Sequence, residues 1–525
     1  MNRLEAFSLD LLSLIESGAV SSRKGLNEAK IRLCAMHGLS SMPSNATILS
    51  FARERTGKIV SLLRVKPTRS LSGIAVVAIM PKPSKCPGKC IYCPSSLVKG
   101  KETPKSYTGK EPATMRALSA GFSPRTQILN RVRQLEEAGH STGKLELIVM
   151  GGTFLAHPKP RQRKFIIASI NALSGASAKT LGGARLAAEN AERKITGITF
   201  ETRPDFCGRR EINAMLEFGG TRCELGVQTV YDNVYKAINR GHSVSDVVDA
   251  TVLLKDSAFK VTYHYMPGLP GVALGQDRKA LRRLFSDHDF MPDNLKVYPC
   301  LVIEGTRLHK MWKARKYRPF TTEKAVRLLS SAKEEIPKWA RVMRIQRDIP
   351  AQLISAGVKK SNLRQLVQRE MQSHGKSCSC IRCREAGLLS RDKENRLSQG
   401  GLFTESYEAS KGIEHFISFE SNDQKCLFGF CRLRLPCKPF RKELLGKTAL
   451  VRELRVFGVP LPLHERNKDA IQHRGLGKTL LSEAEEIARN ELDARKLAVI
   501  SGLGVKPYYY SLGFKKDGLF VSKML

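Results

Sequence analysis

Three cysteines in one short loop are the residues best suited to chemistry in this chain. Cys86, Cys90 and Cys93 stand at the spacing C-x3-C-x2-C, just after an apolar run at residues 74–80. Three clustered thiolates hold three irons of a four-iron cluster and leave the fourth iron open to a ligand. A zinc ion would need a fourth Cys or His nearby, and the motif contains none. The loop therefore predicts a 4Fe-4S cluster suited to one-electron chemistry.

A second cysteine group, Cys378, Cys380 and Cys383, follows His374. Three thiolates and an imidazole, or a ligand from elsewhere in the chain, would complete a tetrahedral zinc site. The short C-x-C spacing strains such a site, and free thiols are the alternative. We favour structural zinc.

Length, charge and hydropathy limit the classes of protein to consider. A chain of 525 residues is expected to divide into two or three domains. The formal charge of +39 indicates a polyanionic partner, and nucleic acid fits better than a membrane, although a generally basic proteome would explain part of the excess. No apolar run approaches the roughly 20 residues of a membrane span, and no secretory signal is evident. We therefore expect the protein to work in the reducing environment of the cytoplasm.

The first 66 residues read as helical and basic, which favours an RNA-binding region over helices that only pack. From residue 74, β-like runs alternate with helical segments, which predicts a parallel sheet with right-handed crossovers. Six such units suit a (β/α)6 partial barrel. The predicted strands are Ile74–Ile79, Leu145–Met150, Ile198–Glu201, Cys223–Gln228, Val261–Met266 and Leu295–Tyr298.

Glycines and polar residues follow these strands at the edge where parallel sheets bind ligands. They are the cysteine loop, Gly151 and Gly152, Glu201 and Arg203, Gln228, and the glycine- and proline-rich segment 266–271. Any one of them would pass for a turn, but five in succession on one edge predict a binding site.

This arrangement resembles the radical S-adenosylmethionine enzymes. The resemblance implies that Cys86, Cys90 and Cys93 bind a 4Fe-4S cluster, whose open iron chelates S-adenosylmethionine and yields a 5′-deoxyadenosyl radical. It implies that Gly151 and Gly152 face the methionine end of that cofactor. It also implies that Glu201, Arg203 and Gln228 lie at its edge.

Two further stretches of this region are basic. Residues 309–320 interleave cations with aromatic side chains, a composition that clamps phosphates and stacks bases, or simply forms a solvated helix face. Residues 342–350 form an unusually polar β-like run, whose cations line a groove or pair with Asp348.

The composition changes after a polar boundary at residues 389–401. Alternating β runs at 416–420, 426–435 and 448–456 precede Gln472-x-x-Gly475-x-Gly477, which opens an amphipathic helix from Leu480 to about Asn490. Backbone N–H groups of such a loop hold a pyrophosphate. With the strand 498–501 and the tyrosines 508–510, this order resembles the α+β fold of the GNAT acetyltransferases, which bind acetyl-CoA.

A radical domain joined to a GNAT-like domain resembles the catalytic subunit of Elongator and its stand-alone archaeal and bacterial relatives. The segments that carry this resemblance, in family order, include CIYCP, SYTGKEPATMRA, ETRPD, YHYMPGLPG, VMRIQRDIP, LVRELRV, QHRGLG and KPYYYSLGF. The predicted organisation is a basic helical RNA-binding region at 1–66, a radical domain at 67–370, a cysteine-rich linker at 371–400 and a GNAT-like domain at 401–525.

The resemblance implies carboxymethylation of carbon 5 of the wobble uridine of tRNA, with acetyl-CoA as the donor of the acetyl group. By position, it makes Lys144 the catalytic lysine of the radical domain that contacts acetyl-CoA. In the GNAT-like domain it implies an acetyl-CoA site formed by Glu453, Leu454, Arg455, Val456, Ile471, Gln472, His473, Gly475, Gly477 and Tyr509. Its partners would be tRNA and either Elongator-like subunits or a second copy of the chain, without a membrane.

The chain departs from the family pattern at Ser95 and Ser96, where glycines are common, at Arg455, where a histidine is common, and at Pro507. Two other functions stay open. One is a protein lysine acetyltransferase with a structural iron cluster, for which Glu453 is the candidate general base. The other is a tRNA-binding scaffold without catalysis.

Overall fold

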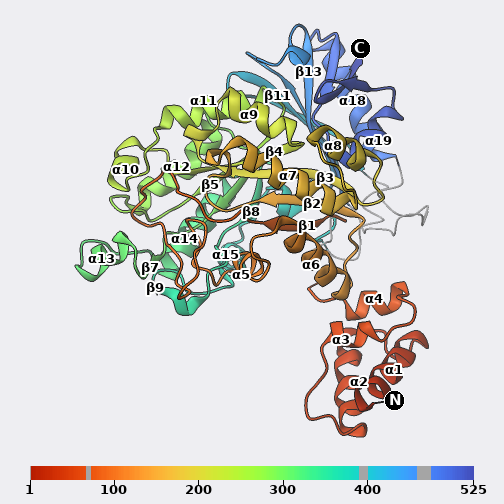
Figure 1. Ribbon diagram of the computed structural model, residues 1–525. Coiled ribbons are helices and arrows are strands. Elements are labelled where there is room, and N and C mark those ends of the chain that lie inside the picture. Colours follow the sequence, from red (N-terminus) through yellow and green to blue (C-terminus); the bar gives the residue numbers. More distant parts are fainter. Residues whose placement is uncertain (1, 67–72, 390–399, 458–474) are drawn as a thin grey trace.

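The computed structural model describes residues 2–66, 73–389, 400–457 and 475–525, and Figure 1 shows three parts along the chain. A bundle of helices comes first, a parallel sheet with covering helices second, and a mixed sheet third. Within these ranges, none of the helices combines the length and the apolar composition that crossing a bilayer requires.

The amino-terminal bundle contains α1 (Arg3–Glu16), α2 (Arg23–Met36), α3 (Asn45–Ser50) and α4 (Gly57–Leu63). Each helix begins after a polar residue whose side chain accepts a hydrogen bond from a backbone N–H of the first turn, namely Asn2, Ser22, Ser44 and Thr56. Apolar side chains from all four helices form a separate core, which includes Phe7 and Leu33. The bundle joins the rest of the molecule at the end of one helix of the second part, where Arg64 Nε donates to the Gly139 carbonyl oxygen at 3.0 Å.

The second part is a curved sheet of seven parallel strands that follow one another in chain order. They are β1 (Ala75–Ile79), β2 (Lys144–Val149), β3 (Lys194–Thr202), β4 (Gly220–Gln228), β5 (Lys260–Tyr265), β6 (Asn294–Val297) and β8 (Arg341–Arg344). Such an order without reversal produces a half-barrel. The six strands predicted from the sequence are confirmed as β1–β6, with small shifts at their ends.

The seventh strand, β8, lies at the start of the polar run 342–350, so the half-barrel has one strand more than predicted. The sequence signal for this strand is weak because the strand has only four residues, and three of them, Arg341, Met343 and Arg344, line a polar cavity.

In the other strands the alternation of inward and outward side chains is clear. On β2, Leu145 and Leu147 are buried under helices, whereas Glu146 and Ile148 alternate with them and line the interior.

Crossover helices cover the outer face of this sheet (Figure 1). They are α6 (Pro124–Glu137), α7 (Lys159–Ser174), α8 (Leu181–Asn190), α9 (Arg209–Glu217), α11 (Val244–Lys255), α12 (Leu274–Ser286) and α14 (Thr322–Glu334). The crossovers also contain α5 (Pro112–Ser119), which lines the cavity inside the half-barrel, and the short helices α10 (Asp232–Ala237) and α13 (Arg307–Lys313). Shorter elements and the helices after β8 complete this part. They are η2 (Phe154–Ala156), η3 (Pro204–Phe206), β7 (Val302–Ile303), η4 (Ala351–Leu353), β9 (Ile354–Ala356), α15 (Leu363–Ser373) and α16 (Ile381–Arg384).

The third part is a mixed sheet in the order β10-β11-β12-β13-β14-β16-β15, in which only β13 and β14 pair in parallel. Its strands are β10 (Gly400–Ala409), β11 (Gly412–Ser421), β12 (Leu427–Leu435), β13 (Thr448–Val456), β14 (Lys496–Val499), β15 (Lys515–Asp517) and β16 (Phe520–Met524). Its helical segments are η5 (Lys442–Leu444), α18 (Leu476–Asn490), η7 (Leu503–Val505) and α19 (Lys506–Tyr510). A separate mixed sheet agrees with the predicted α+β class of this region.

The mixed sheet packs against the amino ends of the parallel strands, opposite the cysteine loop. The segment η7 lies on the start of β3, where a Cβ at Gly504 would come within 2.6 Å of the Ile195 backbone nitrogen. Glycine is needed there because the two backbones approach too closely for any side chain. Beside it, Lys506 Nζ forms an ion pair with Glu189 at 2.5 Å.

A fully buried network of charges joins the two sheets. Arg452 of β13 donates to Asp293, which precedes β6, at 2.5 and 2.9 Å, and to Glu414 of β11 at 2.9 Å. Arg434 of β12 binds Asp256, at the end of α11, at 2.6 Å and Glu414 at 3.0 Å. None of these five side chains is more than 1% exposed. We call them the interdomain ion network.

Charge balance keeps this network ionised. Burial opposes the ionisation of Asp293, but the cations of Arg452, Arg432 and Lys255 outweigh it and hold the pKa of Asp293 below its ordinary value. A buried ion stays charged only while its partners are present.

We expect Asp256→Ala to lower the free energy of unfolding by about 3–5 kcal/mol, because Arg434 would keep a buried charge without its main partner. Thermal unfolding of the full chain, compared with wild type, measures the loss. The control is Glu28→Gln, which removes only an exposed i,i+4 pair with Lys24 and should leave the midpoint nearly unchanged. Equal effects of the two substitutions would contradict the role given to the network.

Candidate active site

A cavity of about 890 Å³ occupies the inner face of the half-barrel. Its lining includes the three cysteines of the first loop at the carboxyl end of the strands, and Arg455 of the mixed sheet at the other end. Between them it is lined by inward side chains of β1–β6. Residues from both sheets therefore face one continuous space.

The cysteine loop lies where the sequence predicted, after β1. Burial, followed by the neighbouring Cys90 and Cys86 thiols, raises the pKa of Cys93 to about 11, so only a bound cation would ionise it at neutral pH. Among the described residues, two groups of possible metal ligands have all their ligand atoms within 4.8 Å of one another. The three Sγ atoms of the cysteine loop do not meet this criterion. Thiolates on one zinc ion stand only about 3.8 Å apart, given Zn–S bonds of ~2.3 Å. At least one pair of the three Sγ atoms therefore stands farther apart than two thiolates on one zinc ion.

The residues predicted after the next strands reach the same cavity. Gly152, Glu201, Arg203 and Gln228 all line it. Gly151 and Gly152 have φ values of 108° and 82°, which only glycine adopts without strain, so the chain turns sharply beside the cysteine loop. These motifs therefore lie together at one edge of the sheet, as predicted. Their contacts with a cofactor stay predictions.

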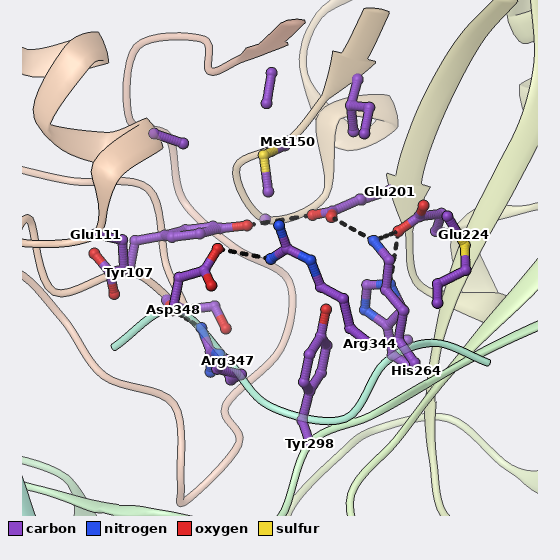
Figure 2. Close-up of a pocket in the computed structure, with 18 of the residues that line it drawn as sticks. Tyr107, Glu111, Met150, Glu201, Glu224, His264, Tyr298, Arg344, Arg347 and Asp348 are labelled. Carbon is purple, nitrogen blue, oxygen red and sulfur yellow. Dashed lines mark hydrogen bonds and ion pairs between the residues drawn. The ribbon is translucent and has the colours of Figure 1, made fainter. Parts of the chain in front are cut away.

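A chain of charged side chains crosses the middle of the cavity (Figure 2). The Tyr107 hydroxyl donates to Glu201 at 3.3 Å, and Lys296 Nζ lies 4.0 Å from Glu201 while pairing closely with Glu224. His264 Nε2 contacts the same Glu224 carboxylate at 2.8 Å.

Burial alone would raise the pKa of Glu224, but Lys296, the hydrogen-bonded His264 and Arg222 outweigh it and hold the pKa well below its usual range. Glu201, Glu224 and His264 are close enough to share a metal ion. However, the ammonium group of Lys296 already pairs with Glu224 and lies 4.0 Å from Glu201. The chain of charges therefore supplies fixed dipoles and a proton network within the cavity.

Cations from the polar run after β8 stand at the same cavity. Arg344 Nη1 pairs with Asp348 at 2.7 Å, and Arg347 Nη2 donates to the Ser106 carbonyl oxygen at 2.5 Å. Figure 2 shows Arg344 reaching toward Asp348, with Arg347 beside Asp348. Both alternatives proposed for this run therefore hold, since its cations line a groove and one of them pairs with Asp348.

The second cysteine group is brought together as predicted. The Sγ atoms of Cys378, Cys380 and Cys383 all lie within 4.8 Å of one another. His374 does not join them, because its side chain is exposed and its Nδ1 contacts the Glu370 carbonyl oxygen at 2.8 Å. Lys333 Nζ lies 3.7 Å from the Cys383 Sγ. Three thiols at this spacing fit one tetrahedral ion with a fourth ligand from outside the group.

The predicted acetyl-CoA residues are spread along the mixed sheet. Glu453, Leu454, Arg455 and Val456 end β13, where Arg455 lies over the Phe457 ring and lines the cavity. Gly475 has a φ of 76° and begins α18. The predicted Ile471, Gln472 and His473 lie outside the described residues.

The two neighbouring tyrosines Tyr508 and Tyr509 lie in different surroundings, and the predicted contact of Tyr509 with acetyl-CoA stays a prediction. Tyr509 is buried in the core of the mixed sheet, against Phe514. Its neighbour Tyr508 is half-exposed, and its hydroxyl group would lie 2.8 Å from a Cβ at Gly477. Tyr508 is thus the tyrosine beside the glycine loop. Pro507 occupies the first turn of α19, where proline is well tolerated.

Lys144 is the first residue of β2, and its side chain is exposed. It pairs in register with Lys194, beside the contact between η7 and β3. Lys144 therefore lies on the side of the half-barrel that faces the mixed sheet, far along β2 from the cysteine loop. Its catalytic role stays a prediction.

The two serines that replace family glycines are held in the loop after Cys93. Lys105 Nζ donates to Ser95 Oγ at 2.6 Å, and Ser96 Oγ accepts from the Val98 backbone N–H at 3.3 Å. The hydroxyl groups thus give this loop side-chain hydrogen bonds that glycines lack.

Several cavity residues were missed by sequence reasoning, among them Tyr107, Glu224, His264, Lys296 and Arg240. A signal was present for three of them. Glu224, His264 and Lys296 are charged or polar residues inside otherwise apolar strands, and such residues mark the inward face of a half-barrel.

Comparisons with known proteins agree with this geometry. The family model described as the Radical SAM superfamily matches residues 80–284, the Radical_SAM C-terminal domain matches residues 292–373, and the ELP3 N-terminal domain matches residues 6–71. The protein is thus an enzyme of the radical SAM class.

Relatives define the family more narrowly. The chain is 47% identical to the tRNA uridine(34) acetyltransferase of Methanocaldococcus jannaschii, over 98% of this chain and 96% of that protein. It is 41% identical to human Elongator complex protein 3, over 98% and 95%. The solved archaeal Methanocaldococcus infernus Elp3, with residues 1–46 deleted, covers 86% of this chain and 100% of its own, at 44% identity and a TM-score of 0.76. The chain belongs to the Elp3 family.

Proposed function

We propose that this enzyme carboxymethylates carbon 5 of uridine 34 in tRNA, using acetyl-CoA as the acetyl donor. The observation that carries the proposal is the single cavity, whose lining includes both the cysteine loop and Arg455 of the mixed sheet. A reaction that joins a radical site to an acyl donor needs such a shared space.

In this proposal Cys86, Cys90 and Cys93 hold a 4Fe-4S cluster, and the cavity edge at Gly151, Gly152, Glu201, Arg203 and Gln228 holds S-adenosylmethionine. When bound, cluster and cofactor supply a 5′-deoxyadenosyl radical. The side chains that line the cavity would orient the reactants around this radical. The chain Tyr107–Glu201–Lys296–Glu224–His264 offers proton donors and acceptors at known atoms inside the cavity.

The mixed sheet would hold acetyl-CoA. The backbone N–H groups of Leu476 and Gly477 at the start of α18 precede the first hydrogen bonds of the helix, and the helix dipole favours a pyrophosphate there. Gly475 and Gly477 leave room for it, while Glu453–Val456 and Tyr508 border the same region. Arg455 would then lie between the CoA site and the half-barrel.

Transfer RNA would bind through cations at the surface and at the cavity. Arg23, Lys24 and Arg32 are exposed on the amino-terminal bundle. On α13 exposed lysines flank His309 and Trp312, whose rings stack with centroids 5.7 Å apart, which suits a base and its phosphates. The relatives named Elongator complex protein 3 support assembly with further subunits. In this proposal the enzyme works in the cytoplasm, either within such an assembly or as a self-associated chain.

Reaction of the reconstituted full chain with S-adenosylmethionine, a reductant, acetyl-CoA and tRNA under anaerobic conditions tests this function. Mass spectrometry of the tRNA nucleosides should detect 5-carboxymethyluridine, and Cys90→Ser should abolish it because one cluster ligand is lost. The matched control is Cys437→Ser, an exposed cysteine outside both cysteine groups, which should leave the yield unchanged.

Three results would contradict the proposal. Formation of 5′-deoxyadenosine without carboxymethyluridine would refute the tRNA assignment. Full activity of Cys90→Ser would refute the radical chemistry. Acetylation of a protein lysine with unmodified tRNA would favour the lysine acetyltransferase instead.

Cys378, Cys380 and Cys383 would hold a structural zinc ion. We expect the purified full chain to carry one zinc per chain, and Cys380→Ser to lose that zinc while keeping its iron, because the two cysteine groups are separate. Elemental analysis by mass spectrometry measures both metals. Unchanged zinc in Cys380→Ser would overturn this assignment, and the control Cys437→Ser should keep both metals.

A further inference from the structure

One buried guanidinium group reaches the cysteine loop from a different part of the half-barrel. Arg240 follows α10 and donates from Nη1 to the Cys90 Sγ at 3.4 Å, and from Nη2 to the Gly226 carbonyl oxygen at 2.5 Å. Its side chain is buried, and none of the described carboxylates forms an ion pair with it. Its positive charge is therefore directed at Cys90.

The backbone holds this contact in place. A Cβ at residue 226 would lie 2.5 Å from Arg240 Nη2, so only glycine leaves space for the guanidinium group. The Arg240 backbone N–H donates to the Tyr235 carbonyl oxygen at 2.9 Å, which closes the turn after α10. From the same turn, the Ile238 carbonyl oxygen accepts the N–H of Ile91, the residue after Cys90, at 3.1 Å. The turn and the cysteine loop are thus one connected unit.

A second guanidinium group lies nearby but is already neutralised. Arg203 forms two hydrogen bonds with Asp205, both at 2.8 Å. Arg240 has no such carboxylate, so it is the less compensated of these two guanidinium groups.

A fixed positive charge at a ligand sulfur has a definite electrostatic effect. Reduction adds one negative charge to a cluster that three thiolates already make anionic. Hydrogen bonds to the sulfurs and nearby charge are among the factors that set the reduction potential of iron–sulfur clusters. Burial strengthens the effect because the local dielectric constant is low.

We propose that Arg240 raises the reduction potential of the cluster by donating to the Cys90 sulfur, and so makes the cluster easier to reduce. This inference rests on the proposed function for one point, that Cys86, Cys90 and Cys93 bind the cluster. Arg240 is a positioning residue, since it acts through Cys90 and not on the substrate.

A potentiometric titration of the reconstituted full chain, followed by electron paramagnetic resonance without S-adenosylmethionine, tests the proposal. Arg240→Met keeps the length of the side chain but removes its charge. At the wild-type midpoint, the ratio of reduced to oxidised cluster should fall at least tenfold, which equals a shift of about 59 mV for one electron. Arg240→Lys should retain most of the wild-type value.

The matched control is Arg344→Met, which removes a cation that lines the same cavity but pairs with Asp348. Its midpoint should stay at the wild-type value. If Arg240→Met does not retain its cluster, Arg240→Gln serves in its place, because it keeps a donor without the charge and should also be harder to reduce.

An unchanged midpoint in the uncharged variants would overturn the proposal, even if their affinity for S-adenosylmethionine fell, because Arg240 would then act on the cofactor alone. An equal shift in Arg344→Met would also overturn it, since any cavity cation would have the same effect. If instead the three cysteines do not bind the cluster that the proposed function requires, the wild-type chain itself would show no cluster signal in electron paramagnetic resonance.

Discussion

The buried network of Arg452, Asp293, Glu414, Arg434 and Asp256 is the constraint on which the arrangement of the two sheets depends. Each of these ions would be costly to bury alone, and each has an oppositely charged partner in the network. The pairs Arg452–Asp293 and Arg434–Asp256 connect the mixed sheet to the half-barrel part. Such a network tolerates little sliding or rotation, since a small shift leaves a charge unpaired. The end of β13 is thereby fixed over the amino ends of the half-barrel strands, and Arg455 faces the cavity.

The same physics organises the interior of the half-barrel. Its inward positions carry charges, which a dry core would not accept, and oppositely charged side chains pair between strands that are two places apart in the sheet. Arg222 pairs with Glu146, and Lys296 pairs with Glu224. The interior therefore remains a polar cavity with fixed dipoles, while the alternate residues of each strand form the apolar layer under the helices. One strand thus provides both the core and the site.

Much of the fold and part of the site follow from the sequence. The cysteine spacing, the six alternating strands and the motifs after them place the cavity edge correctly, because strand period and topology are local signals. Arg240 could not be placed, since its contact with Cys90 joins residues 150 positions apart. The sequence also did not show that Tyr509 is buried while Tyr508 is half-exposed, because packing decides which way neighbouring residues of a short helix face.

The central claim is that one cavity joins the radical site to the acetyl group. Acetyl-CoA with a fully deuterated methyl group tests it most directly, in a reaction with tRNA and unlabelled S-adenosylmethionine. The account predicts that one deuterium appears in 5′-deoxyadenosine and two remain in the carboxymethyl group of the uridine. Unlabelled 5′-deoxyadenosine, formed while three deuteriums stay on the acetyl group, would contradict it.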